Sequence, residues 1–205
     1  AAVHAATVNG FHECLEMLLQ SGAESDVPNH KGQEPVHLSH GENCLEVLVD
    51  FAADVYAQDS MGRTTVFMAA ANGEEGVLRG LLDMDEDQLM IDLGDDRGDT
   101  PLHAAACNRR HSCLKLLLET MADPGIGNAQ GLLPGYLAEC NGHVRCVELL
   151  EKYGGYKRQT DLTEAKARED AKHAEREKKK LEKKERALAA TQEDFSGHGE
   201  RCVRG

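Results

Sequence analysis

The feature that most constrains how this chain folds is a short motif that recurs along it. Its best-preserved copy is Thr100-Pro101-Leu102-His103-Ala104-Ala105-Ala106. The histidine of this copy has counterparts at His4, His37, Phe67 and Tyr136. The successive steps between these positions are 33, 30, 36 and 33 residues. A nearly fixed period in this range is typical of a repeat array, whose members cannot bury their apolar faces alone and must stack.

Each copy carries the local signals of a turn, a helix, a second turn and a second helix. A glycine precedes the first helix where a tight turn can require a positive φ, at Gly32, Gly62, Gly98 and Gly131. Proline suits a first helical turn, where an N–H would have no intrahelical acceptor, and it stands at Pro35, Pro101 and Pro134. Asn-Gly pairs at 9–10, 72–73 and 141–142 are predicted to end first helices. Second helices show one apolar face, as at Leu114, Leu117, Leu118 and Met121.

The stretch from Asp95 to Ala105 resembles the ankyrin repeat almost residue for residue, and five copies in register extend the resemblance over residues 1–155. It implies an all-α fold, an ankyrin-repeat solenoid of about five helix-turn-helix repeats, followed here by a long charged helix. We divide the chain into the array (1–155), a charged helical extension (156–191) and a disordered tail (192–205). The first repeat begins inside its motif, so we expect it to be truncated at its N-terminus.

Two repeats are degenerate. The second is three residues short between His37 and Leu48, so we expect its first helix to be clipped or distorted. The third has Gly76 and Gly80 within its second helix, each costing about 1 kcal/mol relative to alanine. A three-residue insertion follows in the acidic stretch 83–92. The fifth repeat lacks the Thr and His of the motif and is predicted to cap the array.

Charge is unevenly distributed along the chain. Residues 1–155 carry 9 Lys+Arg against 25 Asp+Glu, whereas residues 156–205 carry 14 against 11. An acidic array argues against nucleic-acid binding, which needs a basic surface. The sequence contains no run of 18 apolar residues, so we expect no membrane insertion.

From Asp161 to about Ala190 the chain is rich in Glu, Lys, Arg and Ala, and Asp161-Leu162-Thr163-Glu164 fits a helix-capping box. Three interpretations remain for this helix: a solvated single helix, a weak coiled coil or partner-docking helix, and a contact of its lysines with nucleic acid or anionic lipid. We expect a monomer, with weak dimerisation through the tail as the alternative.

The cysteines and histidines have structural explanations. Six of the seven cysteines fall in two repeat slots, Cys14, Cys44, Cys113 and Cys146 in one and Cys107 and Cys140 in the other. Neighbouring repeats do not converge four ligands on one point, so we predict no metal and no cofactor. Catalytic signatures and a phosphate-binding loop are also absent from the sequence, so we predict no enzymatic activity. Unpaired thiols favour a reducing compartment, the cytoplasm or the nucleus.

What remains is a surface for a partner. In ankyrin proteins recognition commonly uses the turn tips and the concave face of the first helices. Transferred by register, the resemblance implies partner-binding residues at Lys31, Gln33, Met61, Arg63, Arg97 and Asp99. Lys31, Arg63 and Arg97 form a basic row on an acidic array, which favours an acidic peptide.

We therefore predict a non-catalytic protein-interaction module or scaffold. An alternative is the regulatory ankyrin part of a larger enzyme, such as a small-GTPase regulator, a kinase or a ubiquitin-ligase adaptor. A third hypothesis is a structural spacer in which the charged helix sets a distance or dimerises.

Overall fold

The computed structural model describes residues 2–85, 90–154 and 156. Residues 1–157 form one compact unit. Apart from Tyr156, the predicted charged helix and disordered tail lie outside the described residues, as do residues 86–89 of the acidic stretch. The helices are α1 (Ala2–Val8), α2 (His12–Gln20), the 3₁₀ helix η1 (Pro35–Leu38), α3 (Glu42–Asp50), α4 (Thr65–Asn72), α5 (Glu75–Met84), α6 (Pro101–Cys107), α7 (His111–Glu119), α8 (Pro134–Cys140) and α9 (Val144–Lys152).

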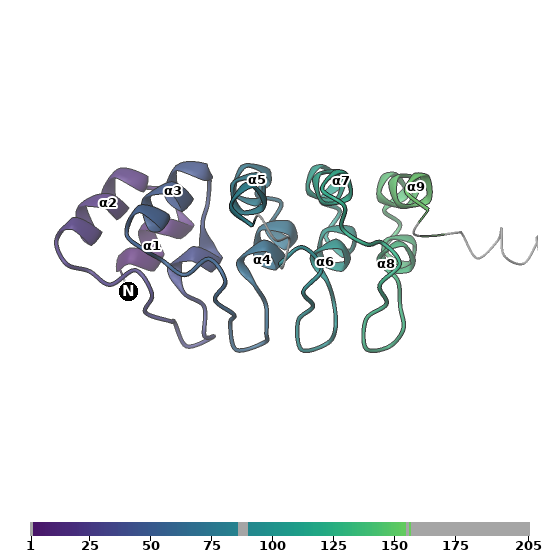
Figure 1. Ribbon diagram of the computed structural model, residues 1–205, viewed down its shortest axis with the longest axis horizontal. Helices are drawn as coiled ribbons and strands as arrows, with labels where there is room; N and C mark the ends of the chain where they lie inside the picture. Colours follow the sequence, from purple (N-terminus) through teal and green to yellow (C-terminus); the bar gives the residue numbers. More distant parts are fainter. Residues whose placement is uncertain (1, 86–89, 155, 157–205) are drawn as a thin grey trace, which may run out of the picture. The chain divides into compact units, whose positions relative to one another are not determined.

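These helices stack in two rows (Figure 1). The first helices of the repeats, α1, η1, α4, α6 and α8, contact one another in chain order, and so do the second helices, α2, α3, α5, α7 and α9. On the other side of the first helices, four loops lead into η1, α4, α6 and α8 (Figure 1). We call these loops the fingers, residues 29–34, 59–63, 95–99 and 128–132. The predicted all-α solenoid is confirmed. None of the described helices has the length and apolar composition needed to cross a bilayer.

The local signals of the sequence act as predicted. Pro35, Pro101 and Pro134 lie in the first turn of their helices, and the glycines of the Asn-Gly pairs have φ values of 70° to 85°. The first helix of the short second repeat is the four-residue η1, so the predicted distortion is confirmed. In the third repeat, a Cβ added to Gly80 would lie 3.1 Å from Leu45 of α3. Glycine at this position therefore lets α5 approach the preceding second helix.

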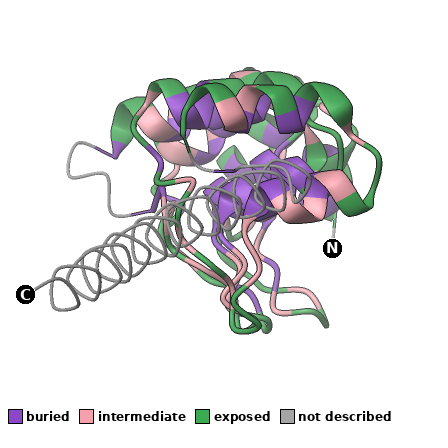
Figure 2. Cartoon of the chain, turned by 90° about the vertical axis from the view of Figure 1, so that its right-hand side faces the viewer, coloured by how far each residue is buried: buried purple, intermediate pink, exposed green. Residues whose placement is uncertain are grey.

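The core lies between the two rows of helices, where buried residues concentrate (Figure 2). Its largest members are leucines of the second helices that are less than 2% exposed: Leu15, Leu45, Leu48, Leu78, Leu81, Leu114, Leu117 and Leu150. Full burial of such a side chain stabilises a fold by roughly 1.5–3 kcal/mol. Since each repeat contributes only two or so of them, its stability depends on the contacts with its neighbours.

The four-cysteine slot is buried in three repeats and exposed in one. Cys44, Cys113 and Cys146 are about 1% exposed, whereas Cys14 is exposed. The cause is geometric: Cys113 lies near Glu74 and Glu75, and Cys146 near Arg109, all in the preceding repeat. Cys14 belongs to the first described repeat, and the described residues include no repeat that covers its slot.

The motif histidines connect consecutive repeats. Nδ1 of His103 accepts a hydrogen bond from the backbone N–H of Thr100 (3.1 Å), which leaves the proton on Nε2, and Nε2 donates to the carbonyl of Leu132 in the next finger (2.9 Å). His37 makes the equivalent pair of bonds, with the N–H of Glu34 (3.2 Å) and the carbonyl of Ala57 (3.1 Å). Neutral imidazole fits both bonds, because a second ring N–H would face an N–H donor.

Phe67 occupies the histidine slot of the third repeat and uses a different interaction. It packs with Met68 and Ala104 in a small apolar cluster separate from the main core, with Ala71 against it. This cluster joins α4 to α6, so a dispersion contact replaces the hydrogen bond between the third and fourth repeats.

The fingers are hydrogen-bonded to one another through their tips. The backbone N–H of Ser60 donates to the carbonyl of Lys31 (3.2 Å), that of Asp96 to Met61 (3.0 Å) and that of Ala129 to Arg97 (2.9 Å). The tip glycines of the first three fingers, Gly32, Gly62 and Gly98, make this approach possible. A Cβ on Gly98, for example, would lie 2.9 Å from the backbone nitrogen of Ala129, closer than real Cβ contacts.

Gly98 and Gly131 form a matched pair for testing this ladder of finger contacts. Both have a positive φ, 72° and 74°, but a Cβ on Gly131 would meet nothing within 4 Å. We expect Gly131→Ala to lower the free energy of unfolding by about 1–2 kcal/mol from backbone strain alone. Gly98→Ala should lower it by at least ~1 kcal/mol more, because a backbone group must move as well. Urea unfolding measures both. Equal losses would show that the tip contact contributes nothing to stability.

The histidine bonds predict a dependence of stability on pH. Burial lowers the pKa of His37 and of His103 below 6.5, against smaller opposing effects of Asp59 on His37 and of Asp95 and Asp99 on His103. The unfolded chain therefore binds protons before the folded chain does, and the stability present above pH 6.5 is lost as the pH falls toward the folded-state pKa values. We expect the free energy of unfolding to fall less steeply below pH 6.5 in the double variant His37→Gln/His103→Gln. Parallel slopes would contradict this assignment.

Met121 offers a stabilising substitution. It has a φ of 72° and is 78% exposed, and Gly22 occupies the equivalent position of the first repeat with a φ of 89°. We expect Met121→Gly to raise the free energy of unfolding by about 0.5–1 kcal/mol, because the relief of left-handed strain exceeds the entropy gained by the unfolded chain. Thermal unfolding measures the change, and a lower midpoint would contradict the expectation.

Candidate partner-binding surface

Each finger is organised by the side chain of one Asn or Asp residue. The carboxylate of Asp95 accepts hydrogen bonds from the backbone N–H groups of Arg97 (2.9 Å) and Asp99 (3.0 Å). Asn29, Asp59 and Asn128 make the same two bonds in the other fingers, at 2.8–3.1 Å. Sequence analysis assigned these residues no role. The signal was nevertheless present, because each lies three residues before its tip glycine.

The six predicted partner-binding residues fall into two structural classes. Lys31, Met61 and Arg97 stand immediately before the tip glycines, and their side chains are exposed. The other three follow the glycines and are held by hydrogen bonds within the array. Gln33 accepts from Asn29 (3.2 Å), Arg63 donates to Asp59, and Asp99 accepts from Asn128 of the next finger (2.8 Å). The first class can reach a partner without losing an existing contact, and the second class holds the fingers in place.

Arg63 therefore does not belong to a row with Lys31 and Arg97. Its guanidinium binds the buried carboxylate of Asp59 through Nε (2.8 Å) and Nη2 (2.5 Å). Burial alone would raise the pKa of Asp59, but the hydrogen bonds from Arg63 and the backbone outweigh it, and the pKa lies below its ordinary value. The predicted basic row is reduced to Lys31 and Arg97, and Met61 stands between them in register.

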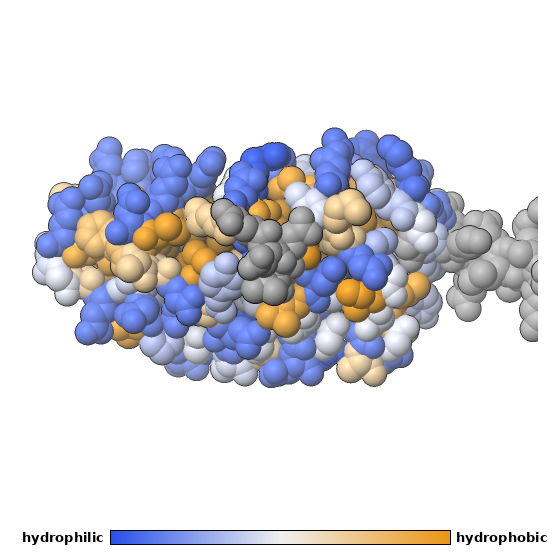
Figure 3. Space-filling view, in the orientation of Figure 1, coloured by the Kyte–Doolittle hydropathy of each residue, from blue (hydrophilic) through white to orange (hydrophobic). Residues whose placement is uncertain are grey.

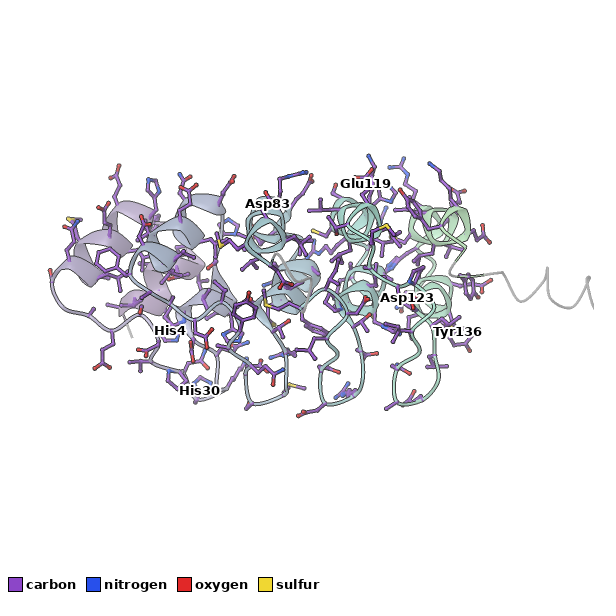
Figure 4. All side chains as sticks on the ribbon, viewed as in Figure 1. His4, His30, Asp83, Glu119, Asp123 and Tyr136 are labelled. Carbon is purple, nitrogen blue, oxygen red and sulfur yellow. The ribbon has the colours of Figure 1, made fainter. Side chains whose placement is uncertain are left out.

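The first helices form the second part of this surface. Val8 of α1, Cys107 of α6 and Cys140 of α8 are exposed, and Leu38 and Leu137 are half-buried on the same row of helices. These three exposed residues are the last residues of α1, α6 and α8, so they lie at the end of the first helices that is away from the fingers. Figure 4 shows His30 among the fingers and Asp83 and Glu119 in the row of second helices.

Among the described residues, no group of three or more His, Cys, Asp or Glu side chains is arranged to hold a metal ion. Burial raises the pKa of the Cys113 thiol to about 11 and also raises the pKa values of Cys44 and Cys146. These thiols stay protonated at neutral pH and are poor nucleophiles.

The opposite face has its own apolar residues. Figure 3 shows them gathered along the middle of the face in view, below the hydrophilic row of second helices. Exposed members occur in the segments that leave the second helices, at Val27, Tyr56, Leu93 and Met121. They are spread over four repeats.

Known proteins with similar sequences share the repeat architecture. Relatives include Probable E3 ubiquitin-protein ligase XBOS32 of Oryza sativa subsp. japonica (31% identical, covering 57% of this chain and 30% of the relative). Ankyrin repeat and SOCS box protein 16 of Homo sapiens is 29% identical over 75% of this chain and 36% of its own length. Inversin of Gallus gallus is 35% identical over 60% of this chain and 11% of its own length. The chain thus spans about a third or less of these relatives.

A family model for ankyrin repeats (3 copies) matches residues 2–92 and 86–161. The match covers the whole described array, including the finger glycines, the motif histidines and the paired helices. The chain therefore belongs to the ankyrin-repeat family.

Proposed function

We propose that this chain is a protein-interaction module that binds a protein partner through the finger tips and the adjoining face of the first helices. The observation that carries the proposal is the ladder of tip hydrogen bonds, which fixes Lys31, Met61 and Arg97 in register with their side chains exposed. A surface that is rigid before binding loses little conformational entropy on association. The fold itself is a non-catalytic interaction fold.

An adaptor or regulatory role within a larger protein is the second candidate function. Its support is that the relatives include a protein named as a ubiquitin ligase and one named for a SOCS box, and that this chain spans only part of them. A longer reading frame with a catalytic or adaptor signature outside residues 1–205 would favour it. For the tail, a spacer role stays a prediction that light scattering with and without residues 158–205 would test.

The compartment we propose is the cytoplasm or the nucleus. Six free cysteines in the described part of the chain support a reducing environment. An acidic peptide stays a prediction for the tips, where Lys31 and Arg97 are the exposed cations.

The finger surface is tested by a double substitution with a matched control. We expect Met61→Ala/Arg97→Ala to lose proteins that the wild-type chain captures from a cell extract, because Met61 and Arg97 project from adjacent tips. The control variant Met17→Ala/Arg79→Ala removes the same two side-chain types from exposed positions on α2 and α5. It should still capture the proteins that the wild-type chain captures. Quantitative mass spectrometry compares the three captured sets. Identical sets for all three proteins would place the partner elsewhere.

A further inference from the structure

Two adjoining depressions lie between the fourth and fifth repeats, at the turns that join first to second helices. The larger has a volume of about 660 Å³, and Arg109, His111, Asn141, His143 and Arg145 are among the residues that line it. The smaller, of about 420 Å³, shares His111 and Arg145 and adds Lys152 and Glu148. Because the fingers precede α6 and α8 while these turns follow them, the depressions lie at the opposite end of the first helices from the fingers.

Cations and acidic residues are equal in number over the segment that lines the depressions, whereas acidic residues predominate in the rest of the array taken together. Residues 105–152 hold five of the nine Lys and Arg residues of the array and five of its 25 acidic residues, whereas residues 1–104 hold the other four and 20. The second helices α2 and α3 contain Glu and Asp but neither Lys nor Arg. An anionic ligand is therefore repelled by residues 1–104 as a group, whereas residues 105–152, which line the depressions, carry no net negative charge.

The cations in the depressions are available to a ligand. Among the described residues, neither Arg109 nor Arg145 has an ion-pair partner, in contrast to Arg63, Arg79 and Lys115. Nδ1 of His143 donates to the carbonyl of Ala106 (2.9 Å), which fixes the ring; Nε2 of the neutral ring is then an acceptor, so the arginines and not His143 attract an anion. That side chain does not cap α9, so the positive end of the α9 dipole adds to the field of the arginines.

The backbone of Arg109 is strained. Its φ is 60°, and the equivalent position holds a glycine with a positive φ in three other repeats, Gly10, Gly73 and Gly142. A non-glycine residue in this conformation costs about 1–2 kcal/mol. Among the described residues, Arg109 makes no ion pair that would offset this strain. Its side chain instead lines the larger depression.

We propose that the two depressions together form a docking site for an acidic peptide segment of a protein partner. Three permanent cations spread over two connected depressions match carboxylates spaced along an extended chain, and guanidinium groups bind carboxylates in bidentate geometry. The acidic remainder of the array opposes a long polyanion or an anionic bilayer, both of which would extend beyond the depressions. The site is separate from the finger surface and does not rest on it.

The test uses fluorescence anisotropy with a ten-residue Gly-Ser peptide that carries four glutamates, and the same peptide with four glutamines. The full chain is used with the five lysines between 178 and 184 changed to Gln, so that the basic cluster of the tail cannot bind the probe. We expect Arg109→Gln/Arg145→Gln to weaken binding of the glutamate peptide about tenfold. Arg79→Gln/Lys115→Gln removes the same net charge from exposed sites on α5 and α7 and should change binding less than about twofold.

A second pair of variants separates binding from stability. Arg109→Gly should raise the midpoint of thermal unfolding and weaken binding of the glutamate peptide. Met121→Gly should raise the midpoint of thermal unfolding and leave binding of the glutamate peptide unchanged. The proposal would be overturned if the two charge-matched double variants had equal effects, or if the glutamine peptide bound with equal affinity. It would also be overturned if anionic vesicles or an oligonucleotide bound in place of the peptide. Loss of partners by the finger variant with unchanged peptide binding would leave it standing.

Discussion

Every repeat of this chain depends on hydrogen bonds and contacts that its own residues cannot complete. The imidazole of His103 needs the carbonyl of Leu132 from the following finger, and the tip carbonyl of Arg97 needs the N–H of Ala129. The leucines of the second helices likewise become buried only when a neighbouring repeat is present. Fold stability and the spacing of the binding surface thus have a common origin, because the bonds that hold the repeats together also hold the finger tips in register.

The parts of the fold that followed from the sequence were those set by backbone chemistry. Glycine at 98 and proline at 101 carry conformational requirements that hold in any context, so the turns and helix starts were predictable. The shortened second repeat was predictable for the same reason, since a deletion within a helix of two turns removes hydrogen bonds that nothing local replaces. Fixed spacing then positioned every element.

The parts that did not follow were those set by neighbours in space. Arg63 looked like a free cation, but Asp59 is four residues before it and binds its guanidinium. Cys14 shares a register position with three buried cysteines and is exposed, because no described residue packs over it as the preceding repeat does over Cys113 and Cys146. The basic depressions combine Arg109 of one repeat with Arg145 of the next. Arg109 could be noticed as a replacement of the repeat glycine, but only the stacking of the repeats shows that it lies near Arg145.

The replacement of histidine by Phe67 has a consequence for how the array comes apart. Protonation in mild acid weakens the bonds that join the second repeat to the third through His37 and the fourth to the fifth through His103. The apolar contact of Phe67, Met68 and Ala104 between the third and fourth repeats has no proton to gain. Acid therefore weakens the histidine bonds on both sides of this contact and leaves the contact itself unchanged.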